Sequence, residues 1–415
     1  MIMFTNGYNL NRDFQIEKTD VFVEGNKIIA IGSCEKEPNE IYDLNGNLLM
    51  PSFKNAHAHS AMTFARSFAD DLPLDLWLNT KIFPLEAKLT GEDIYNLSRL
   101  AFLEYLTSGI SACFDMYYFP EDMAKASVDA GFRTVMCCAI NNFKESIPAL
   151  EEYYNRYNSY DELVSYKLGF HAEYTTSEKI MKDIAKLSEK YQAPVYVHSS
   201  ETKPEVEGCI ERYGKTPTKL FSDLGLFNYG GASFHSVWVN DDDLEIYREK
   251  GIWAVINAGS NCKLASGIAP VSKMIDKGIN LAVGTDGPSS NNALDMFREM
   301  FLIEATQKLN DMDAASTDPI AILKAATIGS AKCMGLDDCD VIDVGKKADL
   351  VVIDLHRPNM QPINNILKNI VYSGSKENVK MTMVGGKILY ENGEFKNTDV
   401  EKIYYNAQKV INRIG

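Results

Sequence analysis

Short apolar runs alternate with longer amphipathic stretches through the middle of the chain, from about residue 51 to residue 345. The intervening stretches have helical periodicity, clearest at 91–109, 176–192 and 240–251, and several begin at Thr, Ser or Asn and end at Gly, as capped helices do. Eight strand-length runs can be counted, at 51–59, 110–118, 132–140, 166–174, 193–201, 231–237, 252–260 and 279–287. Eight such units predict an α/β fold, a (β/α)8 barrel of the TIM type.

The two ends of the chain have a different pattern, in which short strands are separated by turns. The Glu-Gly-Asn at 24–26 and the Asn-Gly-Asn at 45–47 are hairpin signals, and residues 340–396 repeat the same texture. We therefore expect residues 1–50 and 346–415 to form one composite β-sandwich, with the barrel at 51–345. The segment from about 60 to 90 is too long for a simple βα turn, so we expect it to form a lid.

Composition narrows the class of protein. With 57 acidic and 42 basic side chains the net charge is −15, which disfavours a nucleic-acid polymer as a partner but leaves single nucleosides open. The eight cysteines form no CxxC pair, no apolar run approaches 18 residues, and no signal peptide is visible. We expect a cytoplasmic protein without membrane contact, and homo-oligomer formation is left open.

Five of the six histidines lie at or near the ends of the apolar runs, and Asp286 ends the last run. The carboxyl ends of barrel strands form one rim, where chemistry is done. Because residues i and i+2 point to the same face, His57 and His59 can both reach one ion. His198 and Asp286 would complete a set of three nitrogens and one oxygen, leaving a position for water. Each residue alone could be a packing or capping residue, but this joint placement would be a rare accident.

Several segments together carry a family resemblance. They are PSFKNAHAHSAMTFARSFADDLPLDLWL, FPLEAKLT, HAEYTTS, VHSSET, FHSVWV, SNCKLASGIAPV, GTDGPSSNNALDMFREM and GKKADLVVID. Through them the chain resembles the amidohydrolase superfamily, specifically the adenosine-type branch that includes S-adenosylhomocysteine and methylthioadenosine deaminases. The resemblance implies that His57, His59, His198 and Asp286 bind one divalent metal ion, with Zn²⁺ expected ahead of Fe²⁺ or Mn²⁺.

The fourth apolar run, at 166–174, indicates how many metal ions the site binds. Relatives with two ions bridge them through a modified lysine at the end of this strand. Here Lys167 lies near the start of the run and His171 lies further along. A binuclear hydrolase of cyclic amides is therefore disfavoured.

The same resemblance implies roles for the other residues. Glu201 would carry a proton to the ring nitrogen, His235 would orient the attacking water, and Asp286 would accept its proton. Glu86 would hold the ribose hydroxyls and His171 would contact the base from the opposite side. A further residue, Trp77, would supply an apolar wall or would simply pack the lid.

The chain departs from the family pattern at two places. INAGSN replaces a stretch that usually holds a histidine or asparagine and a proline, and Glu173 stands where proline is common. Both would reshape the edge of the pocket. The loop after the third run offers Lys144 and Arg156 but no clear arginine clamp for a carboxylate.

These residues predict a hydrolytic deaminase of an adenine nucleoside, giving the inosine analogue and ammonia. Candidate substrates are adenosine, 5′-deoxyadenosine, 5′-methylthioadenosine and S-adenosylhomocysteine, and we expect the first three to react at least as well as the last. Alternatives are an aminohydrolase or chlorohydrolase of guanine, a pterin or a triazine, and a non-catalytic scaffold. Glu86 favours a ribose, and the complete ligand set argues against a scaffold.

Overall fold

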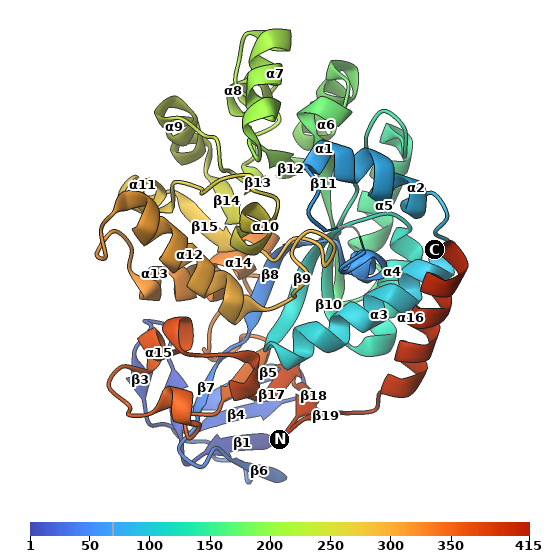
Figure 1. Ribbon diagram of the computed structural model, residues 1–415. Helices are drawn as coiled ribbons and strands as arrows, with labels where there is room; N and C mark the ends of the chain where they lie inside the picture. The colour runs from blue at the N-terminus through green and yellow to red at the C-terminus, as the bar shows by residue number, and fades with distance from the viewer. Residues whose placement is uncertain (69) are drawn as a thin grey trace.

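The computed structural model describes residues 1–68 and 70–415, and the middle of the chain forms a closed barrel above two small sheets (Figure 1). Eight parallel strands pair in chain order, which confirms the predicted (β/α)8 barrel. They are β8 (Phe53–Ala58), β9 (Ile110–Met116), β10 (Arg133–Cys137), β11 (Val164–Ala172), β12 (Val195–Ser199), β13 (Gly231–His235), β14 (Ile252–Ile256) and β15 (Asn280–Val283). Between β15 and β8, the Asp286 N–H donates to His57 O at 3.0 Å, which closes the cylinder.

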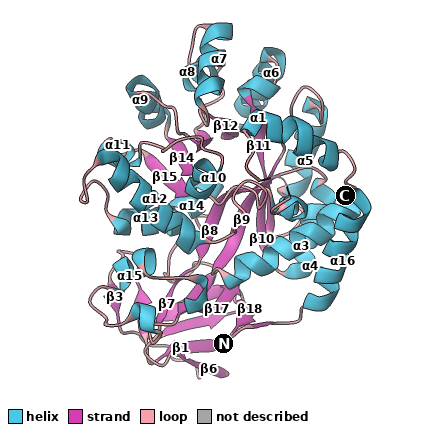
Figure 2. Ribbon diagram, viewed as in Figure 1, coloured by secondary structure: helices cyan, strands magenta, loops and turns pink. Residues whose placement is uncertain are grey.

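Helices surround the barrel, and their ends follow local capping chemistry (Figure 2). The three helices expected from periodicity form α3 (Gly91–Thr107), α6 (Glu178–Tyr191) and α9 (Asp241–Lys250). Reciprocal capping boxes begin α3 at Thr90, α7 (Lys203–Tyr213) at Thr202 and α9 at Asn240. The remaining helices around the barrel are α4 (Pro120–Ala130), α5 (Ile147–Tyr157), α8 (Pro217–Asp223), α10 (Ala258–Lys263), α11 (Val271–Asp276), α12 (Met296–Asp311), α13 (Pro319–Lys324) and α14 (Ser330–Met334).

The run at 252–260 was expected to be one strand, and this expectation is wrong in its second half. β14 ends at Ile256, and α10 begins at Ala258. Asn257 lies between them with φ −117° and ψ 65°, outside both regular conformations. Continuous apolar character does not distinguish a strand from a strand followed by a short buried helix.

Both termini contribute strands to the smaller sheets, as the sequence pattern predicts. One sheet contains β1 (Ile2–Thr5), β4 (Val21–Glu24), β5 (Lys27–Ile31) and β6 (Glu40–Asp43). The other contains β2 (Tyr8–Leu10), β3 (Ile16–Glu17), β7 (Leu48–Pro51), β16 (Leu350–Ile353), β17 (Val379–Val384), β18 (Lys387–Glu391) and β19 (Glu394–Phe395). Buried Phe4, Val23, Leu49, Leu350 and Met381 belong to one cluster that draws on both sheets. The domain boundaries 1–50 with 346–415, and 51–345, remain a prediction.

The two turn signals have different outcomes. Glu-Gly-Asn joins β4 and β5 in an antiparallel hairpin, as expected. Asn-Gly-Asn does not form a hairpin, because it connects β6 of one sheet to β7 of the other. Two further helices follow β16: α15 (Ile366–Tyr372), and α16 (Val400–Ile414), which packs along α3. Among the described residues, no helix combines the length and the apolar character needed to cross a bilayer.

A buried ion pair joins the barrel to the second sheet. Arg133 on β10 donates from Nε and Nη2 to the two carboxylate oxygens of Asp349, at 3.0 and 3.1 Å. The Gly385 N–H donates to the same carboxylate at 2.7 Å. Burial alone would raise the pKa of Asp349, but the charges of Arg133 and Lys54 outweigh it and lower that pKa to about 2. This contact lies at the amino-terminal ends of the barrel strands, away from the rim where the histidines gather.

Candidate active site

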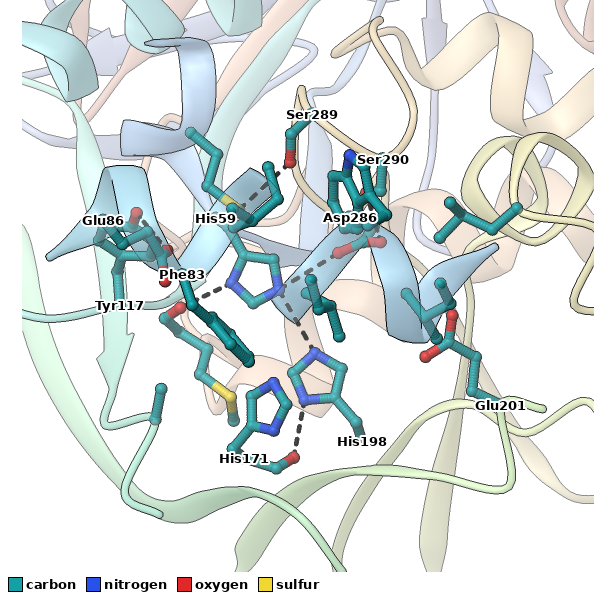
Figure 3. A pocket seen from close by; sticks show the side chains of 18 of the residues that line it. His59, Phe83, Glu86, Tyr117, His171, His198, Glu201, Asp286, Ser289 and Ser290 are labelled. Carbon is teal, nitrogen blue, oxygen red and sulfur yellow. Dashed lines mark hydrogen bonds and ion pairs between the residues drawn. The ribbon is translucent and has the colours of Figure 1, made fainter. Parts of the chain in front are cut away.

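The carboxyl ends of four barrel strands, with the residues that follow them, bring together five side chains of types that can bind a metal ion. Ligand atoms of His57, His198, His235 and Asp286 lie within 4.8 Å of one another. His59 joins this group, because its Nε2 lies 3.2 Å from Asp286 Oδ1 and 3.3 Å from His198 Nε2. Figure 3 shows His59, His198 and Asp286 turned toward one another at the floor of the pocket. The structure thus brings together all four proposed ligands, with His235 beside them.

Hydrogen bonds orient three of the imidazoles. His59 Nδ1 lies 2.7 Å from Met116 O, and His198 Nδ1 lies 2.8 Å from His171 O. His235 Nδ1 lies 2.8 Å from Asn261 Oδ1. Because a carbonyl only accepts, each Nδ1 carries a proton, and in the neutral ring each Nε2 keeps its lone pair for the site. Burial alone would lower the pKa of His59, but the hydrogen bond and charge of Asp286 outweigh it and raise that pKa to about 9, so a metal ion would displace a proton from this ring.

The chemistry of this donor set fits a divalent metal ion. Both ring nitrogens of His57 are buried, and neither has a hydrogen-bond partner among residues 1–68 and 70–415. Burial lowers the pKa of His57 to about 3, so its ring is neutral and can act as a ligand. His57 Nε2 lies 3.3 Å from Asp286 Oδ1. A metal ion at this point would satisfy Nε2 of His57, the ring nitrogen that faces Asp286.

Strained backbone marks the strand ends that carry these groups. Asp286 and His235 have φ values of 60° and 76°, and Ser200 beside the loop after β12 has φ 56°. Non-glycine residues in this region cluster at functional sites, where the surrounding structure holds them in place. Asp286 lies three residues beyond the end of β15, rather than at the strand end where the sequence places it.

Glu201 lies on the opposite side of the histidines from Glu86 (Figure 3). One of its oxygens is 3.7 Å from His235 Nε2, and the other accepts a hydrogen bond from Ser266 Oγ at 3.3 Å. Burial raises the pKa of Glu201, which suits a group that must both hold and release a proton. The loop around it is fixed by Glu205, which accepts from the N–H groups of Ser200 and Glu201 at 2.8 Å each.

A pocket lies above these groups, and residues of the expected lid line one side of it. The expected lid contains a 3-10 turn at Ser60–Ala65 and then α1 (Leu74–Trp77), a π-turn at Leu78–Ile82 and α2 (Phe83–Glu86). Trp77 lines the pocket and also belongs to the buried hydrophobic cluster, so its position is compatible with both alternatives, an apolar wall and packing of the lid. This segment gives the pocket an apolar side of the kind that suits an aromatic ring.

Glu86, at the end of α2, lines the same pocket. The Tyr117 hydroxyl donates to Glu86 Oε1 at 2.6 Å, and both residues are buried. Burial raises the pKa of Glu86. The carboxylate has acceptor capacity beyond the one bond to Tyr117, so it can accept from ligand hydroxyls.

An ion pair ties the start of the lid to the rim. Lys263 Nζ donates to Asp70 Oδ1 at 2.5 Å, to Asn292 Oδ1 at 2.7 Å and to Ser289 O at 2.9 Å. Asn292 also donates to Asp70 Oδ2 at 3.2 Å. The lid is therefore attached to the loop after β15, which carries Asp286.

His171 lines the pocket, and its Nδ1 lies 2.9 Å from Thr175 Oγ1. The neighbouring departure from the family pattern, Glu173, is buried and paired with Arg212 of α7 at 3.0 Å through Nε. It therefore links the segment after β11 to α7. Lys144 Nζ lies 4.1 Å from the ring centroid of Tyr118, a lining residue, whereas Arg156 pairs with Glu121 at 3.4 Å.

Four residues of the site were not predicted from the sequence. Tyr117 directly follows β9, and Glu205 stands three residues after Thr202 in a capping-box pattern, so both had a readable signal. Ser260 and Ser290 each donate to Asp286 Oδ2 at 2.6 Å. No local sequence pattern identifies Ser260 or Ser290 as a partner of Asp286, because a serine in a polar loop has no distinctive spacing to the group it contacts.

Known proteins are similar to this chain over most of its length. The model of the amidohydrolase family matches residues 48–389, and the chain therefore belongs to the amidohydrolase family. The 5-methylthioadenosine/S-adenosylhomocysteine deaminase of Thermoanaerobacter pseudethanolicus is 38% identical over 404 residues, covering 95% of this chain and 94% of that relative. The 5′-deoxyadenosine deaminase of Methanosarcina mazei is 34% identical over 427 residues, covering 100% of this chain and 98% of that relative.

A solved structure matches over a comparable length. It is an adenosine deaminase from Xanthomonas campestris with bound zinc, at a TM-score of 0.95 and 30% sequence identity. The match covers 100% of this chain and 98% of that one. The likeness therefore includes the small sheets as well as the barrel.

Proposed function

We propose that this protein is a mononuclear, metal-dependent aminohydrolase that removes the 6-amino group of an adenine nucleoside. The single observation that supports this most is the convergence of His57, His59, His198 and Asp286 on one point, with Glu201 and His235 beside it. The names of the relatives from Thermoanaerobacter pseudethanolicus and Methanosarcina mazei point to the same substrate class. Zinc is the proposed metal, because the matching structure from Xanthomonas campestris carries it.

The side chains divide the proton transfers among them. When bound, the divalent ion supplies a water molecule whose pKa is lowered toward neutrality. Asp286 takes the proton of the attacking water and later passes it to the departing amine. Glu201 gives a proton to ring nitrogen N1 as charge builds there. When the C–N bond breaks, Glu201 is reprotonated by the hydroxyl on C6, which leaves a carbonyl at C6 and the proton on N1. His235, 3.7 Å from Glu201, accepts a hydrogen bond from the attacking water through the lone pair of its Nε2 and so orients that water toward the ring carbon.

The other pocket residues are proposed to hold the substrate. Glu86 accepts from the ribose hydroxyls, His171 contacts the base, and Trp77 covers it from the lid. All three line the same pocket. The proposed product is the corresponding inosine analogue, released with ammonia.

The preferred nucleoside depends on the substituent at the 5′ carbon. A homocysteine tail brings a carboxylate that calls for a cationic partner. Arg156 is already paired with Glu121. Lys144 lies over the ring of Tyr118 and has a single ammonium group, so it cannot bind a carboxylate through two parallel hydrogen bonds as a guanidinium group does. We therefore propose that adenosine, 5′-deoxyadenosine and 5′-methylthioadenosine react at least as well as S-adenosylhomocysteine.

A purine nucleoside screen with ammonia detection tests the proposal. Purified protein loaded with Zn²⁺ should release ammonia from adenine nucleosides, and the Glu201→Gln variant should retain its metal but lose most activity. Release from guanine, a pterin or a triazine with none from adenine nucleosides would overturn the substrate class. A panel of kcat/KM values led strongly by S-adenosylhomocysteine would overturn the expected order.

A further inference from the structure

The segment 257–261 directly follows β14, and two of its side chains contact groups of the proposed metal site without lining the pocket as substrate contacts. It joins the end of β14 to the first turn of α10. Ser260 and Asn261 are both buried. One contacts Asp286 and the other contacts His235, the two groups that the proposed reaction uses beside Glu201.

The contact to Asp286 decides which of its oxygens faces the ligand set. Oδ1 lies 3.3 Å from His57 Nε2 and 3.2 Å from His59 Nε2. Oδ2 accepts the hydroxyls of Ser260 and Ser290, each at 2.6 Å. Ser290 Oγ also lies 3.0 Å from Gly287 O, but its single proton goes to the shorter, charged contact. Two donors on Oδ2 prevent the carboxylate from rotating, so Oδ1 stays toward the histidines.

The contact to His235 decides which nitrogen of its ring is protonated. Asn261 Oδ1 accepts from His235 Nδ1 at 2.8 Å, so Nε2 keeps its lone pair. The side-chain amide of Asn257 is oriented so that its oxygen accepts from the His235 backbone N–H at 3.3 Å. Its nitrogen then donates to Gly284 O at 3.1 Å. The segment therefore holds both the backbone and the ring of His235.

The segment itself is anchored from behind. The Gly259 N–H donates to Glu299 Oε2 at 2.9 Å, and Glu299 Oε1 accepts from Asn291 at 2.6 Å. A Cβ at Gly259 would lie 2.4 Å from Glu299 Oε1, so only glycine allows this approach. Asn291 also donates to Thr285 O at 2.7 Å, which ties the segment to the loop that carries Asp286.

We propose that residues 257–261 are a positioning element, in which Ser260 fixes the carboxylate of Asp286 for the metal ion and Asn261 fixes the imidazole of His235 for the reaction. The second half rests on the proposed function, whereas the first half concerns metal binding alone. Groups that orient metal ligands commonly change metal affinity or activity by about 10- to 100-fold when removed.

Zinc affinity, measured by competition with a chromophoric chelator on the metal-free full-length protein, tests the first half. Ser260→Ala and Ser290→Ala should each weaken Zn²⁺ binding, and the double variant should weaken it by about 10- to 100-fold. Ser260→Thr keeps the hydroxyl and should restore most of the affinity. Ser188→Ala is the matched control, because Ser188 is also buried and donates at 2.7 Å to the backbone oxygen of Ala193, two residues after the end of α6. Unchanged Zn²⁺ affinity in the double variant would overturn this half, whatever the substrate is.

Steady-state kinetics on the best nucleoside test the second half. Asn261→Ala should lower kcat by about 10- to 100-fold with KM and Zn²⁺ affinity unchanged, and Asn261→Asp, which keeps an acceptor oxygen, should recover much of kcat. Loss of Zn²⁺ affinity in Asn261→Ala equal to that in Ser260→Ala would overturn the division of roles. Melting temperatures of the metal-free variants exclude misfolding. If no purine nucleoside reacts, the function fails, but the zinc measurements still decide the role of Ser260.

Discussion

Replacing Glu86 tests whether the pocket recognises a sugar. Tyr117 occupies one acceptor position of the carboxylate, at 2.6 Å, and about three positions remain for the two ribose hydroxyls. A hydrogen bond to a charged group contributes about 1.5–3 kcal/mol. Taking the lower value twice, Glu86→Ala should cost about 3 kcal/mol in transition-state binding, or roughly 100-fold in kcat/KM for adenosine.

The test depends on comparing substrates that have the ribose hydroxyls with substrates that lack them. The same variant should change kcat/KM for 2′,3′-dideoxyadenosine and for free adenine little, because neither offers the two hydroxyls. Ammonia release is measured at pH 8, because burial raises the pKa of Glu86 and a higher pH favours its ionised form. Tyr117→Phe is the control: it removes the internal donor to Glu86 but leaves the carboxylate in place. Equal losses of kcat/KM on adenosine and its dideoxy analogue would refute the assignment of Glu86 to the sugar.

Three further predictions concern the proton carrier, the metal and the buried ion pair. Glu201→Gln should lower kcat by about 10²- to 10⁴-fold without loss of bound metal, as checked by ammonia release and elemental analysis. Removal of the metal by a chelator should abolish activity and lower the melting temperature. Adding Zn²⁺ at about 100 times its Kd should restore about 2.7 kcal/mol of the free energy of unfolding, as measured by calorimetry. A melting temperature that does not change on chelation would count against a preformed site. The lowered pKa of Asp349, about 2, means that its ion pair with Arg133 stabilises the fold above about pH 4 and is lost as pH falls toward 2. Melting temperatures between pH 5 and 2 should therefore fall more steeply in the wild type than in Asp349→Asn, which should itself be less stable at pH 7.

The sequence predicted the architecture well because the barrel repeats a local signal. Each βα unit has its own apolar run and capped helix, so errors in one unit do not affect the others. The proposed ligand set could be predicted from the sequence for a related reason. All eight strands are parallel, so their carboxyl ends lie on one rim of the barrel. Residues at strand ends, such as His57 and Asp286, are therefore expected to lie near one another even though they are distant in sequence.

What could not be predicted depends on contacts between distant segments. The end of β14 at Ile256 is set by Asn257 and the packing of α10, neither of which interrupts the apolar run. Likewise, the bond from Ser260 to Asp286 requires the loop after β15 to return over α10. The sheet change at the Asn-Gly-Asn turn depends on which partner strand is available, which local turn chemistry does not encode.

The hydrogen bond from the Asp286 N–H to His57 O has a consequence for how the enzyme matures. This backbone hydrogen bond joins the last barrel strand to the first. The side chains of the same two residues are proposed to bind one metal ion. Closing the barrel therefore also brings His57 and Asp286, two of the four proposed ligands, within 3.3 Å of each other. Metal uptake during refolding should for that reason depend on the meeting of the first and eighth strands.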